Sequence, residues 1–190
     1  MKNLLIGGAG LLGLALLAAA ICIPGYNRAK VLNQDVQAQW GNVEVQLQRR
    51  FDLIPQLEAT VKGVAGQEQK VFLGIAEARK AYFQPGAGVA EKAAAANDMT
   101  SALSRLLVLQ EKYPELKSNE AFMKLQDSVE GTENRLGVER GRYNQAVREL
   151  NVYTQTFPNN LYAMLAGVKE VPYLKAPSEA SEAPKIDFSK

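Results

Sequence analysis

The chain contains no histidine and only one cysteine, Cys22, which lies within an apolar run. Histidine is the side chain that most readily exchanges a proton near neutral pH, and histidine and cysteine are the usual zinc ligands. Their scarcity argues against His-based acid–base catalysis, a catalytic thiol, zinc sites of the Cys/His type and a disulfide within the chain. We therefore predict no catalytic residue, no metal and no cofactor, and expect a protein that is not an enzyme.

An excess of charge of either sign is also lacking. There are 22 lysines and arginines against 20 aspartates and glutamates, giving a formal net charge of +2. Binding to nucleic acid generally needs a basic patch or stripe. The pair Arg49-Arg50 is too small and local to supply one, so we predict no nucleic-acid partner.

Charged residues are missing altogether from residues 3 to 27, and Leu4–Ile23 is an almost purely apolar run of 20 residues. An apolar helix of about 20 residues matches the hydrocarbon core of a bilayer. We predict a single-pass anchor over residues 1–25 that contacts the lipid bilayer through residues 4–24. It ends at Pro24-Gly25, which is either a break or a kink in one continuous helix.

Two alternatives to an uncleaved anchor remain. Ala18 and Ala20 form a small-x-small site of the kind that ends a signal peptide, although the apolar run is longer than such peptides need. Cys22 is the residue that a lipoprotein anchor would use, but Ile21 before it is not the small residue expected there.

The side of the membrane is almost undetermined by charge. Lys2 precedes the run, and Arg28 and Lys30 follow it with Asp35 close by, so the positive-inside rule is near a tie. The short N-terminal tail leans towards an extracytoplasmic domain in a bacterial cell membrane.

Apolar residues after the anchor recur at helical spacing. From residue 32 to residue 54 the steps of 4, 4, 3, 4, 4 and 3 form an 11-residue repeat, typical of a helix that is nearly straight. The residues of this stripe are Leu32, Val36, Trp40, Val43, Leu47, Phe51 and Ile54. Pro55 then allows two interpretations: either Asp52 caps a new helix, or Pro55 kinks one long helix.

Later breaks divide the rest of the domain. Residues 84–88 (QPGAG) form a turn, residues 89–112 form an Ala-rich helix, and Ser118 or Asn119 caps a long helix that reaches about Phe157. Its stripe is Phe122, Leu125, Val129, Thr132, Leu136, Tyr143, Val147, Leu150, Thr154 and Phe157, with a double step across Arg140.

A short helix follows Pro158 and ends at Gly167, and residues 175–190 read as a disordered tail. The fold class is therefore all-α: an antiparallel bundle of about four long helices over residues 26–174, attached to one N-terminal transmembrane helix.

Several charged and polar residues lie near helix ends and seams. We predict a structural or partner-binding cluster consisting of Arg49, Arg50, Asp52, Glu133, Arg135 and Asn144. The structural interpretation pairs an arginine with Glu133; the functional one gives the arginines an anionic ligand. Asn144 and Asn151, seven residues apart, could set helix register or a self-associated state, so we expect a homo-oligomer or a complex with other membrane proteins.

Several short segments have specific residue patterns that a helical bundle in general does not require. They are residues 26–27 (YN), 45–55 (VQLQRRFDLIP), 113–117 (YPELK), 132–135 (TENR), 143–144 (YN) and 157–158 (FP). In this order they resemble the bacterial LemA family. The resemblance implies a single N-terminal membrane helix, an all-α domain and no established activity; some members occur in magnetosome membranes and others look lipid-anchored.

Together these features favour a non-enzymatic, membrane-anchored helical scaffold or adaptor that self-assembles or organises membrane. The alternatives are an accessory subunit or regulator of a membrane enzyme such as a protease, and a sensor of a small anionic ligand.

Overall fold

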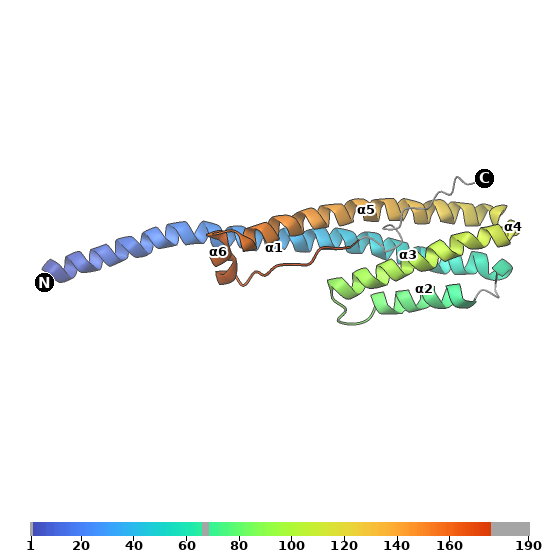
Figure 1. Ribbon diagram of the computed structural model, residues 1–190, viewed down its shortest axis with the longest axis horizontal. Coiled ribbons are helices and arrows are strands. Elements are labelled where there is room, and N and C mark those ends of the chain that lie inside the picture. Colours follow the sequence, from blue (N-terminus) through green and yellow to red (C-terminus); the bar gives the residue numbers. More distant parts are fainter. Residues whose placement is uncertain (1, 66–68, 176–190) are drawn as a thin grey trace, which may run out of the picture. The chain divides into compact units, whose positions relative to one another are not determined.

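The computed structural model describes the backbone of residues 2–65 and 69–175; the side chains of residues 2–12, 15, 18, 57, 62–65, 69, 70, 107, 109, 110 and 117 lie outside the description. The helices are α1 (Lys2–Ala65), α2 (Gln69–Tyr82), α3 (Val89–Lys112), α4 (Pro114–Lys117), α5 (Glu120–Gln155) and α6 (Asn159–Leu165) (Figure 1). No strand occurs in residues 2–65 and 69–175, so the predicted all-α class is confirmed.

The predicted anchor forms the beginning of α1. Helix α1 continues through Pro24-Gly25, so the alternative of one continuous helix is correct and the break is not. The side chains of residues 2–12 of this anchor, and all of residue 1, lie outside the description. Within the part that is described, no helix is both long and apolar enough to cross a membrane. The predicted tail from residue 176 also lies outside the described residues.

Pro55 likewise falls inside α1 and does not end it. An interior proline removes one helix hydrogen bond and typically costs about 3 kcal/mol or more. The apolar stripe is buried on both sides of Pro55, at Phe51, Ile54 and Val61, and this burial offsets the cost. The alternative of a capped new helix is therefore wrong, and Asp52 is not an N-cap.

The described chain separates into two compact units. One unit comprises Asn42–Arg140 and contains the later part of α1, helices α2 to α4 and the first part of α5. Its buried core consists of Val43, Leu47, Phe51, Ile54, Val61, Val71, Ile75, Ala78, Tyr82, Ala95, Ala96, Met99, Ala102, Leu103, Leu106, Leu116, Phe122, Leu125, Val129 and Leu136. These residues include the predicted stripe of α1 that falls in this unit and, apart from the buried Thr132, that of α5.

Two local signals set the boundaries of helices in this unit. Gly86 has a φ of 81°, a left-handed value that favours glycine, in the turn between α2 and α3. The Asn119 side chain accepts a hydrogen bond from the backbone N–H of Phe122 at 3.1 Å, so Asn119 is the predicted cap of α5.

The other unit comprises residues up to Gly41 together with Gly141–Tyr173. Its core pairs Ala29, Leu32 and Val36 of α1 with the later stripe of α5, and the half-buried Trp40 meets Tyr143 edge to face at 5.8 Å between ring centroids. Phe157 is 80% exposed and lies beyond the end of α5, so its predicted place in the stripe is wrong.

Helix α6 packs directly against the backbone of α1 at Gly25. A Cβ atom at position 25 would lie 2.1 Å from the ring of Tyr162, so only glycine allows this approach. The Tyr153 hydroxyl donates a hydrogen bond to the Gly25 carbonyl at 2.7 Å. Gly25 is therefore a notch that receives aromatic residues from α5 and α6, which explains a glycine inside a continuous helix.

The chain after α6 forms an extended strap, residues 168–173. Gly167 has a φ of 66°, and the backbone N–H of Val168 donates to the Ala163 carbonyl at 2.9 Å, which closes α6 with a left-handed glycine cap. The buried Asn151 side chain then donates to the Val171 carbonyl at 2.8 Å and accepts from the Val171 N–H at 2.9 Å. Asn151 thus holds the strap; its predicted role in register or self-association stays a prediction.

Replacing Asn151 by alanine should lower the free energy of unfolding by about 1–2 kcal/mol, because both polar backbone groups of Val171 lose their partner. Hydrogen exchange at the Val171 amide and denaturant unfolding measure the effect. Asn151→Asp is the matched variant, since it keeps an acceptor for the Val171 N–H but loses the donor. Unchanged exchange at Val171 in Asn151→Ala would contradict the clamp.

Candidate functional site

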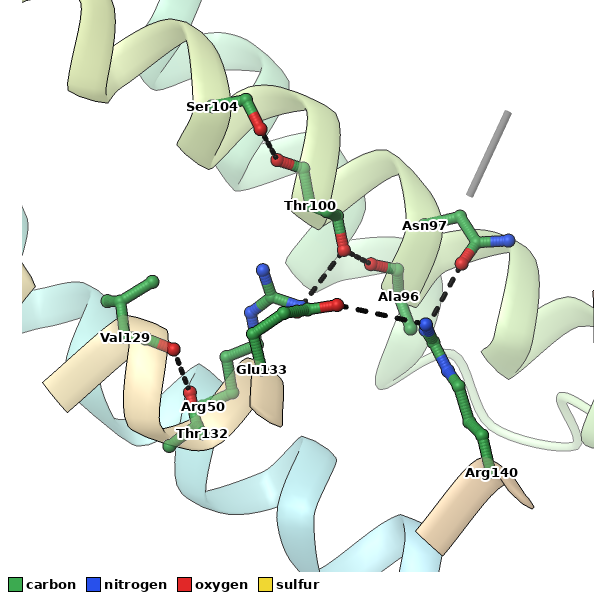
Figure 2. Close-up of polar contacts among 9 residues, drawn as sticks. All are labelled: Arg50, Ala96, Asn97, Thr100, Ser104, Val129, Thr132, Glu133 and Arg140. Carbon is green, nitrogen blue, oxygen red and sulfur yellow. Dashed lines mark hydrogen bonds and ion pairs between the residues drawn. The ribbon is translucent and has the colours of Figure 1, made fainter. Parts of the chain in front are cut away.

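The most deeply buried charge in the described chain is Arg50 of α1, which is 2% exposed. Its Nη1 lies 2.5 Å from Oε2 of Glu133 on α5 and donates to the Thr100 hydroxyl on α3 at 3.0 Å. The predicted pairing of an arginine with Glu133 is thus found at Arg50. Figure 2 shows how this one guanidinium joins three helices.

A second arginine enters the same network from α5. Arg140 Nη1 lies 3.9 Å from Oε1 of Glu133, and its Nη2 donates to the Asn97 side-chain oxygen at 3.1 Å (Figure 2). The side chain of Arg140 is 13% exposed. The double step in the α5 stripe therefore marks a side chain that reaches across to α3.

Two guanidinium groups share one carboxylate, so Arg50, Arg140 and Glu133 together carry a net charge of +1. Burial lowers the pKa of Arg50; the negative charge of Glu133 opposes this shift and the positive charge of Arg140 adds to it. Burial also lowers the pKa of Arg140, again opposed by Glu133. Removing a buried charge from water is costly, and Glu133 is the group that compensates both arginines.

A second ion pair links α1 to α3 nearby in the same unit. Lys92 Nζ lies 2.5 Å from Glu44 Oε1 and 5.7 Å from the centre of the Tyr82 ring. Tyr82 stacks against Phe51 with ring centroids 4.4 Å apart. Burial and the charge of Glu44 raise the pKa of Tyr82 to about 12, so its hydroxyl stays protonated at neutral pH.

The structure does not gather the whole predicted cluster. Arg49, Asp52 and Arg135 are exposed, on helix faces that point away from the core. Asn144 is half-buried and belongs to the unit that contains α6, whereas Arg50 and Glu133 belong to the other unit. Of the six predicted residues, only Arg50 and Glu133 form the network.

Sequence reasoning missed the contribution of α3. Asn97 and Thr100 lie one helical turn apart in the Ala-rich helix and supply the acceptors for the two arginines. The Thr100 hydroxyl also donates to the Ala96 carbonyl at 3.1 Å, which orients its free lone pair toward Arg50. Two polar residues three apart within an alanine run were the signal that could have found them.

Replacing Asp52 by alanine should change the free energy of unfolding by no more than about 0.5 kcal/mol. Asp52 is exposed and only accepts a hydrogen bond from Gln48, one turn earlier, at 2.9 Å. Thermal unfolding beside the parent measures this. A loss of the roughly 1 kcal/mol expected for a helix cap would restore the capping interpretation.

The chemistry of the network is that of a clamp between helices. Arg50 Nη1 contacts Glu133 and Thr100, and Arg140 contacts Glu133 and Asn97, while Arg50 Nε has no hydrogen-bond partner. Arginine remains charged even where its pKa is lowered. Among the described residues, no group of three or more His, Cys, Asp or Glu could hold a metal ion. The arrangement can therefore fix the register of α1, α3 and α5, because each charge must face its partner.

The described chain is all-α, and buried polar contacts join α1, α3 and α5 in one of its units. The sequence pattern of the LemA family matches residues 39–188. The chain belongs to the LemA family, as the resemblance of its motifs indicated.

Curated relatives carry a more specific name. The chain is 27% identical over 173 residues to magnetosome protein MamQ of Magnetospirillum gryphiswaldense, covering 78% of this chain and 64% of the relative. It is 25% identical over 175 residues to magnetosome protein MamQ 2 of Paramagnetospirillum magneticum, covering 79% and 64%. This chain therefore spans a little under two thirds of the length of these relatives.

Proposed function

We propose that this protein is a non-enzymatic adaptor that is anchored in a bacterial membrane by the start of α1 and presents its helical domain beside that membrane. One observation carries the proposal. Large apolar side chains of the uncharged run are 55–69% exposed, so the rest of the described chain does not cover them. These residues are Leu14, Leu16, Leu17, Ile21 and Ile23. A continuous apolar surface of this kind needs a non-aqueous environment, which a bilayer supplies.

The adaptor part of the proposal depends on how the polar groups are used. The buried arginines and Glu133 are engaged in contacts between helices, and histidine is absent from the chain. The fixed register gives the unit Asn42–Arg140 a defined helix arrangement, which suits a protein that holds partners. A second copy of this chain or another membrane protein is the partner that we propose.

The anionic-ligand alternative gains less support. Glu133 and Thr100 already engage Nη1 of the buried Arg50, while Arg49 lies on an exposed face. An accessory role beside a membrane enzyme agrees with the adaptor and differs only in the partner. The names of the MamQ relatives connect those proteins with the magnetosome; for this chain we propose only the membrane-anchored bundle.

Charged substitutions in the full-length chain test the anchor. Arginine at positions 14 and 17, near the middle of the run, should cost about 3 kcal/mol each for insertion, since arginine is strongly disfavoured at the centre of a membrane helix. Leu14→Arg with Leu17→Arg should therefore move the protein from the alkali-resistant membrane fraction to the extractable fraction.

The matched control is Val45→Arg, which changes an exposed apolar residue of the same helix outside the run. It should leave the protein in the membrane fraction. Parent protein that is extracted as readily as the double variant would overturn the anchor. Measuring the native mass of the parent in mild detergent then distinguishes a homo-oligomer from a monomer that recruits another protein.

A further inference from the structure

Helix α6 exposes the face that a short helix normally buries. Leu161, Met164 and Leu165 occupy positions i, i+3 and i+4, the spacing of a core-facing stripe, yet they are 45%, 70% and 65% exposed. Phe157, just before the helix, is 80% exposed. Helix α6 contains no charged residue. We call Phe157, Leu161, Met164 and Leu165 the α6 apolar face.

The opposite face of α6 fixes the helix in place. Ala163 and Ala166 are buried, the Tyr162 ring fills the notch at Gly25, and Asn151 holds the strap that follows. The left-handed cap at Gly167 ends the helix in a defined geometry. The α6 apolar face is therefore held outward by specific contacts, so its exposure is a feature of the packed unit.

The site of attachment connects this face with the apolar run. Gly25 follows Ile23 by two residues, which is about 3 Å along a helix, and Ile21 and Ile23 are themselves 55% and 56% exposed. Helix α6 therefore contacts α1 within one turn of the end of the run, as Figure 1 shows for α6 beside α1.

Aromatic residues with a polar end surround the same point. Tyr153 and Tyr162 meet at Gly25, and Tyr26 is 40% exposed with Lys30 Nζ lying 5.7 Å from its ring centre. Tyrosines and cations are typical of the level at which a membrane helix leaves the hydrocarbon and reaches the headgroups.

We infer that the α6 apolar face lies in the bilayer, at the boundary between headgroups and acyl chains, as a second membrane contact beside the anchor. This inference rests on the proposed membrane anchoring by α1. The occupant is the lipid bilayer because the face belongs to a helix that contacts α1 within one turn of the exposed end of the apolar run, and because it carries no charge that would select a protein partner. Two contacts at one level fix the orientation of the unit that contains α6 at the surface, which one helix alone would leave free.

Spin labels on the full-length protein test this inference. Cys22 is the single cysteine, so Cys22→Ala provides a background for labelling one site at a time. The test sites are Leu161→Cys and Met164→Cys, with Leu16→Cys as the lipid reference and Val45→Cys as the water reference; all four parent residues are exposed. The protein is reconstituted into vesicles of phosphatidylethanolamine and phosphatidylglycerol in equal parts, and collisions with oxygen and with a water-soluble nickel chelate are measured.

Oxygen concentrates in hydrocarbon and the nickel chelate in water. At residues 161 and 164 we expect the ratio of oxygen to nickel collisions to exceed that at residue 45 several-fold and to lie below that at residue 16. A ratio at 161 and 164 equal to that at 45, with a lipid-like ratio at 16, overturns this inference and leaves the anchor intact. A water-like ratio at 16 overturns the anchor itself. Labels at 161 and 164 shielded from both reagents would show a protein, such as a second copy, on this face and would also overturn the inference.

Discussion

Replacing Glu133 by glutamine should lower the free energy of unfolding by about 3 kcal/mol. Arg50 is 2% exposed, the Arg140 side chain is 13% exposed, and Glu133 is a carboxylate within 4 Å of both guanidinium groups. A glutamine keeps the size but leaves two buried positive charges without compensation, and breaking a buried pair from one side is strongly destabilising. Denaturant unfolding of the parent and the variant measures the difference.

Two matched variants separate this effect from a general loss of charge. Arg49→Gln removes an exposed arginine one residue from Arg50 and should change stability by less than about 0.5 kcal/mol. Arg50→Met should lower the free energy of unfolding less than Glu133→Gln does. It removes one buried positive charge, and Glu133 then has only Arg140 to compensate within this network. If Arg50→Met proves the more destabilising of the two, the balance of charge that we assign to the network is wrong.

Replacing Gly25 by alanine should lower the free energy of unfolding by about 2 kcal/mol and release α6 from α1. The added Cβ would lie 2.1 Å from the Tyr162 ring, and overpacking of this kind typically costs 1–3 kcal/mol. Hydrogen exchange over residues 157–173 should rise, while exchange in α3 of the other unit should stay unchanged.

A second glycine of α1 provides a control, for which helix propensity predicts a gain in stability and not a loss. Gly41 also lies inside α1, but nothing is within 4 Å of a Cβ placed there, so Gly41→Ala should stabilise the chain by up to about 1 kcal/mol. Combining Gly25→Ala with Tyr162→Ala should be no worse than Tyr162→Ala alone, because the ring that clashes is gone. Additive losses in the double variant would show that Gly25 matters for another reason.

Much of the helical architecture could be predicted because it follows from local signals. The stripe from Leu32 to Ile54 is buried apart from the half-buried Trp40. Local chemistry that no tertiary contact overrides also determines three later features. They are the turn at residues 84–88, the Ala-rich helix Val89–Lys112 and the Asn119 cap. A continuous periodic pattern and good capping residues are sufficient for such elements.

The prolines left two alternatives open for a physical reason. Pro24 and Pro55 each disfavour a helix locally, yet α1 continues through both; at Pro55 the apolar residues before and after it are buried, whereas those before Pro24 are exposed. A cost of about 3 kcal/mol is comparable with the burial of one or two large apolar side chains. Sequence alone does not show whether those side chains find a partner, so the continuous helix was one of two open alternatives.

The candidate site could be predicted only in part. Arg50 and Glu133 have opposite charge and lie on the core-facing sides of their helices, which is enough to expect a pair. The contacts of Arg50 with Thr100 and of Arg140 with Asn97 depend on the register of α3 against α1 and α5, which no local pattern gives. Arg49 and Arg135 belonged to the same motifs but point to solvent, because adjacent residues on a helix are about 100° apart.

Because α1 is one continuous helix, the number of residues between its core positions is constrained. One residue inserted between Leu32 and Val43 would turn the two halves of the stripe by about 100° against each other, and a core-forming side chain would then face water. An insertion of 11 residues, three turns at about 3.67 residues each, returns the stripe to its original face. Changes in the length of α1 are therefore favoured in steps close to whole turns, such as 7 or 11 residues, whereas the turn at residues 84–88 tolerates insertions at an entropic cost that grows only slowly with their length.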